Sequence, residues 1–318
     1  MELKKAWPAD KRDVVQRGGG SGWLYVGLVI GMLMIGGGLF LNSDQGSALI
    51  AGAPEILADQ LPEFSETPET SEEIDQRFRD ASGSDNWPEA LEHATTYVDR
   101  WPDDYYGYVI RGYASWNLDD CGSAIVDFNT VNDLAPNYSY AYWAQSFCQL
   151  FLGNAVSAEE SSRMALETAG DSTDRYHADL LAGWFAYRSR DYATAAAYFE
   201  KAGRFDNANS QALVGQWLSL SMDGKTATHV LDQTQKQSSN RDWLLDLALD
   251  LFSGDLPAHT FLEEADHDPA AYFYLAQYHL VQGQAAEVRE ALEQAAQGAS
   301  ATFIEVPMAR QMLRDRNE

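Results

Sequence analysis

The sequence predicts an all-α protein, with one N-terminal transmembrane helix followed by a solenoid of stacked helix pairs. Three observations support this fold class: an uncharged apolar stretch near the N-terminus, a pattern that recurs about every 34 residues, and the lack of sustained β-strand alternation. We expect five parts, namely a basic cytoplasmic N-terminus (1–22), the transmembrane helix (23–42), an acidic linker (43–70), helical repeats (71–240) and a degenerate helical C-terminal part (241–318).

The composition of the 318-residue chain is that of a folded and strongly acidic protein. Hydrophobic residues make up 45% and aromatic residues 12%, which is too rich for an intrinsically disordered chain. The formal net charge is −26, from 22 basic and 48 acidic residues. Because phosphate backbones repel such a surface, we expect no nucleic-acid partner. The acidity itself has two readings, a saline habitat or a cationic partner.

The uncharged stretch from Trp23 to Leu41 has the length of a membrane-spanning helix. About 20 residues, each rising ~1.5 Å, cross the hydrocarbon core of a bilayer. Five basic residues precede the stretch, and the next basic residue is Arg77. The positive-inside rule therefore predicts a single-pass bacterial inner-membrane protein with a periplasmic C-terminal domain. The alternative is a cleaved signal peptide, whose apolar region is usually shorter, about 7–15 residues.

Two further features concern the anchor and its connection to the rest of the chain. Gly27 and Gly31 form a G-x-x-x-G pair, which lets two membrane helices approach closely, although glycine is common in such helices anyway. Residues 43–70 carry six acidic residues, three prolines and no basic residue. As a flexible chain they would reach about 30 Å and hold a folded domain just off the bilayer surface.

A 34-residue period organises the next part of the chain. Ala90, Ala124 and Ala158 are spaced by 34 residues, and Ala195 follows after a three-residue slip. Small and aromatic positions recur with them, at Gly112, Gly183, Phe128 and Phe199. We assign repeats to 71–104, 105–138, 139–173 and 176–209, a degenerate fifth from 210, an irregular helical stretch at 241–266 and a last helix pair at 269–298.

This pattern resembles the tetratricopeptide repeat (TPR) superfamily over residues 71–298. The resemblance implies helix–turn–helix units whose first helices line a concave surface. Nine of its fifteen groove positions in the second to fourth repeats are aromatic, namely Tyr106, Tyr113, Trp116, Tyr140, Trp143, Phe147, Phe151, Trp184 and Tyr187. One reading is a partner-binding groove for a protein or peptide, since large aromatic side chains are common binding anchors. The other is that these side chains pack against one another or against the C-terminal helices.

Cysteine and histidine usage gives no sign of catalysis or of a metal site. Cys121 and Cys148 belong to neighbouring helices, so a disulfide and two buried free thiols are equally open interpretations. No pair of the six histidines has metalloprotease-like spacing, and there is no nucleophile-elbow or dinucleotide-binding motif. We therefore expect no enzyme, no cofactor and no bound metal.

A finer resemblance concerns the C-terminal half, from Trp243 and Leu244 to the segment 271–280. It is similar to NlpI-like bacterial TPR lipoproteins, dimeric envelope adaptors that recruit peptidoglycan hydrolases and a processing protease. This chain has a membrane span where that family has a lipidated cysteine. The resemblance implies a periplasmic scaffold that organises cell-wall hydrolases or an envelope complex, with a homodimer as one arrangement. The alternatives are a chaperone beside export or cytochrome-assembly machinery, and a structural subunit of a membrane complex.

Overall fold

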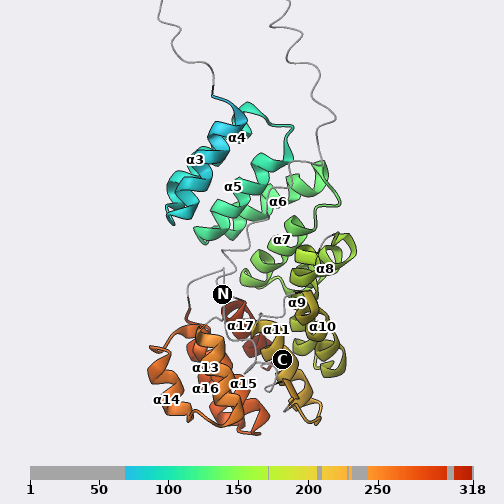
Figure 1. The fold of residues 1–318 in the computed structure, drawn as a ribbon, viewed down its shortest axis with the longest axis vertical. Helices are drawn as coiled ribbons and strands as arrows, with labels where there is room; N and C mark the ends of the chain where they lie inside the picture. Colours follow the sequence, from blue (N-terminus) through green and yellow to red (C-terminus); the bar gives the residue numbers. More distant parts are fainter. Residues whose placement is uncertain are drawn as a thin grey trace, which may run out of the picture. The chain divides into compact units, whose positions relative to one another are not determined.

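The computed structural model describes residues 69–170, 172–205, 210–227, 229–230, 243–298 and 304–316. The chain divides into two units, and all the described helices belong to the one that contains residues 71–318 (Figure 1). These helices are α3 (Ser71–Gly83), α4 (Trp87–Arg100), α5 (Tyr105–Asn117), α6 (Cys121–Leu134), α7 (Ser139–Phe151), α8 (Ala155–Thr168), α9 (Ser172–Arg188), α10 (Tyr192–Phe205), α11 (Ser210–Met222), α13 (Trp243–Ser253), α14 (Ala258–Glu264), α15 (Pro269–Val281), α16 (Ala285–Ala295) and α17 (Glu305–Asp315).

Successive helices pack as pairs, and the pairs follow one another along the chain. Helices α3, α5 and α7 begin at the expected first residues of their repeats, whereas α9 begins at Ser172, four residues early. The last pair, α15 and α16, occupies the segment in which a closing pair is expected. The described residues are helical or irregular and contain no strand. The all-α, TPR-type helical-repeat arrangement is thus confirmed.

Close contact within a pair depends on the small and aromatic positions of the repeat. A Cβ atom added to Gly112 on α5 would lie 2.9 Å from the ring of Phe128 on α6. The same contact recurs one pair later, where a Cβ on Gly183 would lie 2.8 Å from the ring of Phe199. Both phenylalanines are fully buried. The glycine therefore lets the first helix approach the aromatic ring of the second, as the sequence pattern predicts.

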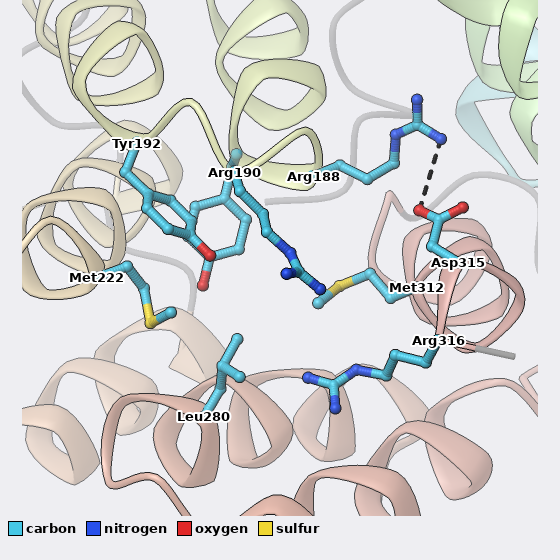
Figure 2. A pocket seen from close by; sticks show the side chains of 9 residues that line it. Arg188, Arg190, Tyr192, Met222, Leu280, Met312, Asp315 and Arg316 are labelled. Carbon is cyan, nitrogen blue, oxygen red and sulfur yellow. Dashed lines mark ion pairs between the residues drawn. The ribbon is translucent and has the colours of Figure 1, made fainter. Parts of the chain in front are cut away.

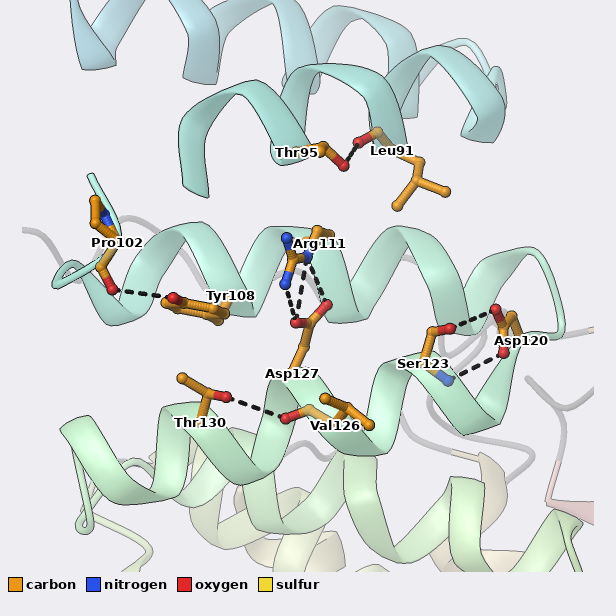
Figure 3. Close-up of polar contacts among 10 residues, drawn as sticks. All are labelled: Leu91, Thr95, Pro102, Tyr108, Arg111, Asp120, Ser123, Val126, Asp127 and Thr130. Atoms are coloured by element: carbon orange, nitrogen blue, oxygen red, sulfur yellow. Dashed lines mark hydrogen bonds and ion pairs between the residues drawn. The ribbon is translucent and has the colours of Figure 1, made fainter. Parts of the chain in front are cut away.

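A polar contact also links the two helices of the second repeat (Figure 3). Asp127 on α6 is buried, and Arg111 on α5 donates to it through Nε at 3.0 Å and through Nη2 at 2.6 Å. This two-pronged geometry holds the guanidinium in the plane of the carboxylate. At the N-terminus of α6, the side chain of Asp120 accepts a hydrogen bond from the backbone N–H of Ser123 at 3.0 Å and so caps the helix.

The turn between the two helices of a pair uses one left-handed residue at a fixed position. It lies 14 residues after the first residue of each expected repeat and has φ between 56° and 84° at Asp85, Asp119, Gly153, Arg190, Gly224 and Gly283. Left-handed backbone costs most residues about 1–2 kcal/mol, and glycine, asparagine and aspartate adopt it most readily. Arg190 is the exception in this set, because it is a long side chain at a position otherwise held by glycine or aspartate.

The C-terminal helix α17 packs against α7, α15 and α16. Arg310 lies over the ring of Phe151 at 4.9 Å from its centroid, and Arg314 donates to the carbonyl oxygen of Gly153 at 3.1 Å. Asp315 pairs with Arg188 at the end of α9, at 3.7 Å. Helix α17 therefore joins the closing helix pair to the third and fourth repeats.

Two further expectations concern the transmembrane segment and the two cysteines. The transmembrane segment 23–42, with Gly27 and Gly31, lies outside the described residues, and within the described part no helix has the length and apolarity needed to cross a membrane. Cys121 and Cys148 are buried, free thiols, so the disulfide reading is not the one seen here. Burial, and after it the neighbouring thiol of Cys121, raise the pKa of Cys148 above its ordinary value.

Candidate protein-binding site

Most of the predicted groove residues lie in two clusters of packed aromatic rings. Trp116 contacts Trp143 with ring centroids 5.5 Å apart, and Trp143 contacts Phe147 at 5.1 Å and His177 at 4.8 Å. A second cluster begins at Trp184, whose ring lies 5.7 Å from that of Phe273 on α15. The rings contact edge-on or tilted, which is the arrangement that their quadrupoles favour.

Seven of these nine side chains are buried, and only Tyr106 and Phe151 are half-buried. The open aromatic groove expected from the sequence is therefore absent from the described residues, and these rings fill the core instead. The physical reason is that the first helices contact one another directly, α5 with α7 and α7 with α9, while α15 contacts α11 and α17 contacts α7. Binding of a partner by these nine residues stays a prediction that would require the domain to open.

A pocket of about 260 Å³ lies beside this core, at the turn between α9 and α10 (Figure 2). Its walls come from five helices and one turn, and its lining residues are Tyr187, Arg188, Arg190, Tyr192, Met222, Leu280, Met312, Asp315 and Arg316. Only Tyr187 belongs to the predicted groove. The others are spread over 129 residues of sequence, from Arg188 to Arg316, so no local motif marks them.

Arg188 forms the fixed wall of the pocket. Its side chain is 14% exposed and pairs with Asp315 at 3.7 Å and with Glu159 at 3.4 Å. The guanidinium also lies 5.9 Å from the centroid of the Phe185 ring. Because its carboxylate partners Glu159 and Asp315 are 56% and 39% exposed, this ion-pair group contributes more to position than to stability. Arg188 thus holds the end of α17 against the end of α9.

Arg190 and Arg316 form the cationic mouth of the pocket. Figure 2 shows their side chains extending from the α9–α10 turn and from the end of α17 toward the same space. Within the described part of the chain, neither guanidinium takes part in an ion pair or a side-chain hydrogen bond. The two groups therefore keep their donors available, five N–H groups on each guanidinium.

The two tyrosines that line the pocket have different roles. The hydroxyl of Tyr187 donates to Gln277 Oε1 at 2.9 Å, which links α9 to α15 inside the core. Burial raises the pKa of Tyr192, and the positive charges of Arg190 and Arg316 oppose that rise. Both guanidiniums therefore exert their field at the Tyr192 hydroxyl, inside the pocket.

The side chains that line the pocket determine which kind of ligand it can bind. No cluster of three or more histidine, cysteine or acidic side chains suited to a metal ion occurs among the residues that the structure describes. The pocket offers two cationic donors, a partly buried hydroxyl and apolar walls from Met222, Leu280 and Met312. This combination suits an anionic group joined directly to an apolar one.

Comparison with known proteins gives the fold and no closer relationship. No protein-family model matches the sequence, and no curated protein sequence matches it. Among solved structures, PilW, described as a widely conserved type IV pilus biogenesis factor, superposes with a TM-score of 0.50 at 16% identity, over 71% of this chain and 100% of that one. PilF of Pseudomonas aeruginosa gives 0.49 at 12% identity, over 69% and 95% of the two chains. YrrB, described as a TPR protein with an unusual peptide-binding site, gives 0.39 at 14% identity, over 72% and 100%.

Proposed function

We propose that this chain is a membrane-anchored scaffold that binds other proteins and has no enzymatic activity of its own. The observation that carries the binding part is the pocket at the α9–α10 turn, where donors and apolar walls from a TPR-type array meet. TPR-type arrays present extended surfaces to partner proteins and do not enclose a reaction chamber. A fold alone does not fix a function, so the proposal rests on the site.

The anchor and the location are supported by the sequence alone. The uncharged stretch at 23–41 has the length of a spanning helix, and the basic residues stand on its N-terminal side. In this proposal the N-terminus is cytoplasmic, and the helical domain lies in the periplasm at the end of the acidic linker. A bound partner would then be held within about 30 Å of the inner membrane.

In this proposal, the scaffold assembles or recruits other proteins of the bacterial envelope. Two observations support it, the resemblance of the sequence to NlpI-like adaptors and the TPR-type fold, which a protein described as a pilus biogenesis factor also has. Cell-wall hydrolases and the subunits of an envelope complex are both partners of this class. Neither line identifies which partner this chain binds.

Crosslinking in the native membrane tests the proposal. Full-length protein is crosslinked, solubilised and co-purified, and protease accessibility of the helical domain is measured in intact spheroplasts. We expect one or a few periplasmic or inner-membrane proteins to co-purify, and the domain to be digested without lysis. A domain that is protected in spheroplasts and digested only after lysis would contradict the topology, and purification without any partner would contradict the scaffold.

A structural subunit of a membrane complex is the second candidate, favoured by one observation. Six large hydrophobic side chains are exposed in the described residues, and five of them belong to two consecutive repeats, namely Leu118, Val126, Leu134, Leu152 and Val156. Exposed apolar side chains concentrated in this way suit a permanent contact. This candidate predicts stoichiometric co-purification that is lost with Val126→Ser/Val156→Ser and survives changes in the pocket.

A further inference from the structure

The pocket at the α9–α10 turn is cationic in a chain that is otherwise strongly acidic. The protein carries a formal net charge of −26, yet three of its 22 basic residues line this one pocket. The only acidic residue in the lining is Asp315, and it is paired with Arg188. Arg190 and Arg316 therefore give the pocket a net positive charge, which is the opposite of what the overall composition suggests for a partner.

The position of Arg190 is unusual for a side chain of its size. Its φ is 62°, and the five equivalent turns of the described repeats use glycine or aspartate. An arginine here keeps a backbone conformation that costs most residues about 1–2 kcal/mol. Strained residues persist where the surrounding structure holds them and are found preferentially at binding sites. The turn geometry directs this one guanidinium into the pocket, as Figure 2 shows.

The size and walls of the pocket restrict its ligand. A volume of about 260 Å³ falls below the roughly 300–1,000 Å³ of sites for drug-sized molecules, so it suits one residue better than a whole cofactor. Met222, Leu280 and Met312 form apolar walls close to the two guanidiniums. A ligand that uses both features therefore carries an anionic group close to an apolar one. The C-terminal residue of a peptide does so, because its carboxylate and its side chain share one Cα.

We propose that this pocket binds the free C-terminal carboxylate of a partner protein, with Arg190 and Arg316 as the donors and the last apolar side chain against Met222, Leu280 and Met312. Guanidinium groups match a carboxylate with paired N–H donors, and such charge-assisted hydrogen bonds are stronger than neutral ones. Arg188 positions α17 and does not contact the ligand. This inference rests on the proposed function, since it names the part of the partner that the scaffold holds.

Methyl NMR of the full-length protein in detergent micelles tests the binding chemistry. The chain has seven methionines, and ¹³C-methyl labels on Met222 and Met312 report on the pocket, while Met164 and Met308 serve as internal controls. The probe is a pentapeptide that ends in leucine, Gly-Ser-Gly-Ser-Leu, with either a free C-terminal carboxylate or a C-terminal amide. Sodium acetate and inorganic phosphate are titrated separately to distinguish a peptide from a small anion.

We expect the carboxylate peptide to shift the Met222 and Met312 methyl signals, and the amide to bind at least about tenfold more weakly. The variants Arg190→Gln and Arg316→Gln should each weaken the carboxylate peptide about tenfold and leave the amide unchanged. The control Arg204→Gln removes an exposed arginine on α10 that pairs with Glu200 at 2.6 Å, away from the pocket, and should bind like the wild type. Unchanged Met308 and Met164 signals show that each variant is folded.

Equal binding of acid and amide, or no shift of either pocket methyl, would overturn the proposal. Phosphate that binds at least as tightly as the peptide would also overturn it, in favour of a free inorganic anion. Partners that still co-purify with Arg190→Gln/Arg316→Gln would contradict the pocket while leaving the scaffold intact. Loss of every partner from the wild-type preparation would instead contradict the proposed function, so the two failures are distinguishable.

Discussion

The guanidinium of Arg314 donates a hydrogen bond to the carbonyl oxygen of Gly153 at 3.1 Å, although the two residues are 161 positions apart in the chain. Gly153 is the left-handed residue of the α7–α8 turn, with φ of 84°. A Cβ atom at this position would overlap the Arg314 guanidinium. The turn of the third repeat is thus shaped to receive the C-terminal helix.

This relationship predicts that Gly153→Ala destabilises the protein for two reasons. The substitution strains the left-handed backbone, which costs about 1–2 kcal/mol, and it also displaces Arg314. Gly224→Ala is the matched control, because Gly224 has φ of 70° and no atom near an added Cβ. Urea unfolding followed by circular dichroism should show a larger loss for Gly153→Ala. Equal losses would mean that the Arg314 contact contributes nothing to stability.

The buried hydrogen bond from Tyr187 to Gln277 predicts a second effect. Tyr187→Phe keeps the ring but leaves Gln277 Oε1 without its donor, so the free energy of unfolding should fall by about 1–3 kcal/mol. Tyr142→Phe is the control, since its hydroxyl donates to the Pro136 carbonyl at 3.2 Å on the surface. That change should stay within about 0.5 kcal/mol. Comparable losses in both variants would contradict a special role for the α9–α15 link.

Glu305 predicts a pH dependence of stability. It is buried at the start of α17 and accepts a hydrogen bond from Tyr274, and burial raises the pKa of its carboxyl above the ordinary range. A raised folded-state pKa means that the protonated form is favoured by folding. Its stabilising effect is present below the unfolded-state pKa and is lost as pH rises through the folded-state pKa. The contribution of Glu305 to the free energy of unfolding is therefore lower at neutral pH than at acidic pH. At neutral pH the buried carboxyl must either ionise in the core or keep a proton that it would lose in the unfolded chain.

Glu305→Gln removes that cost, because the amide is neutral at every pH. The free energy of unfolding of the variant minus that of the wild type should therefore increase as the pH is raised from about 4.5 to about 8. The exposed residue Glu287 on α16 provides the matched control as Glu287→Gln, since both changes remove one negative charge. If the two variants have the same pH profile, net charge and not burial of Glu305 explains the trend.

The two cysteines give a prediction that separates the two readings of the sequence. Both thiols are buried and free, and burial raises the pKa of Cys148 well above its ordinary value. A thiol reagent should not react with the native protein, because little reactive thiolate is present. After unfolding without reductant, two thiols per chain should react. A count of zero would establish the disulfide that the positions of Cys121 and Cys148 in the sequence also allow.

The repeat architecture could be predicted because its determinants are local and periodic. Gly112 and Phe128 face each other within one 34-residue unit, so their spacing alone indicates the contact. The left-handed turn residue is equally periodic, but its sequence signal is clear only where it is glycine, as at Gly153. At Arg190 the residue type gives no sign of the backbone conformation, because the three-dimensional surroundings hold it there.

The outcome for the aromatic residues could not be predicted, because it depends on contacts distant in sequence. Trp184 has the spacing of a groove residue, and whether it faces a partner or the core depends on Phe273, 89 residues later. The pocket shows the same limit, since Arg190 and Arg316 come together only through the packing of α17. Periodicity identifies which face of a helix is apolar, but not which element covers that face.

The most direct test of the central claim is quantitative co-purification from the native membrane with three forms of the full-length protein. These are the wild type, Arg190→Gln/Arg316→Gln and the control Arg204→Gln. If the chain is a scaffold that holds its partner at the α9–α10 pocket, one or a few envelope proteins will co-purify with the wild type and the control and be depleted about tenfold or more with the double variant. Equal recovery of the same partners with all three forms would contradict the claim that this pocket is the binding site.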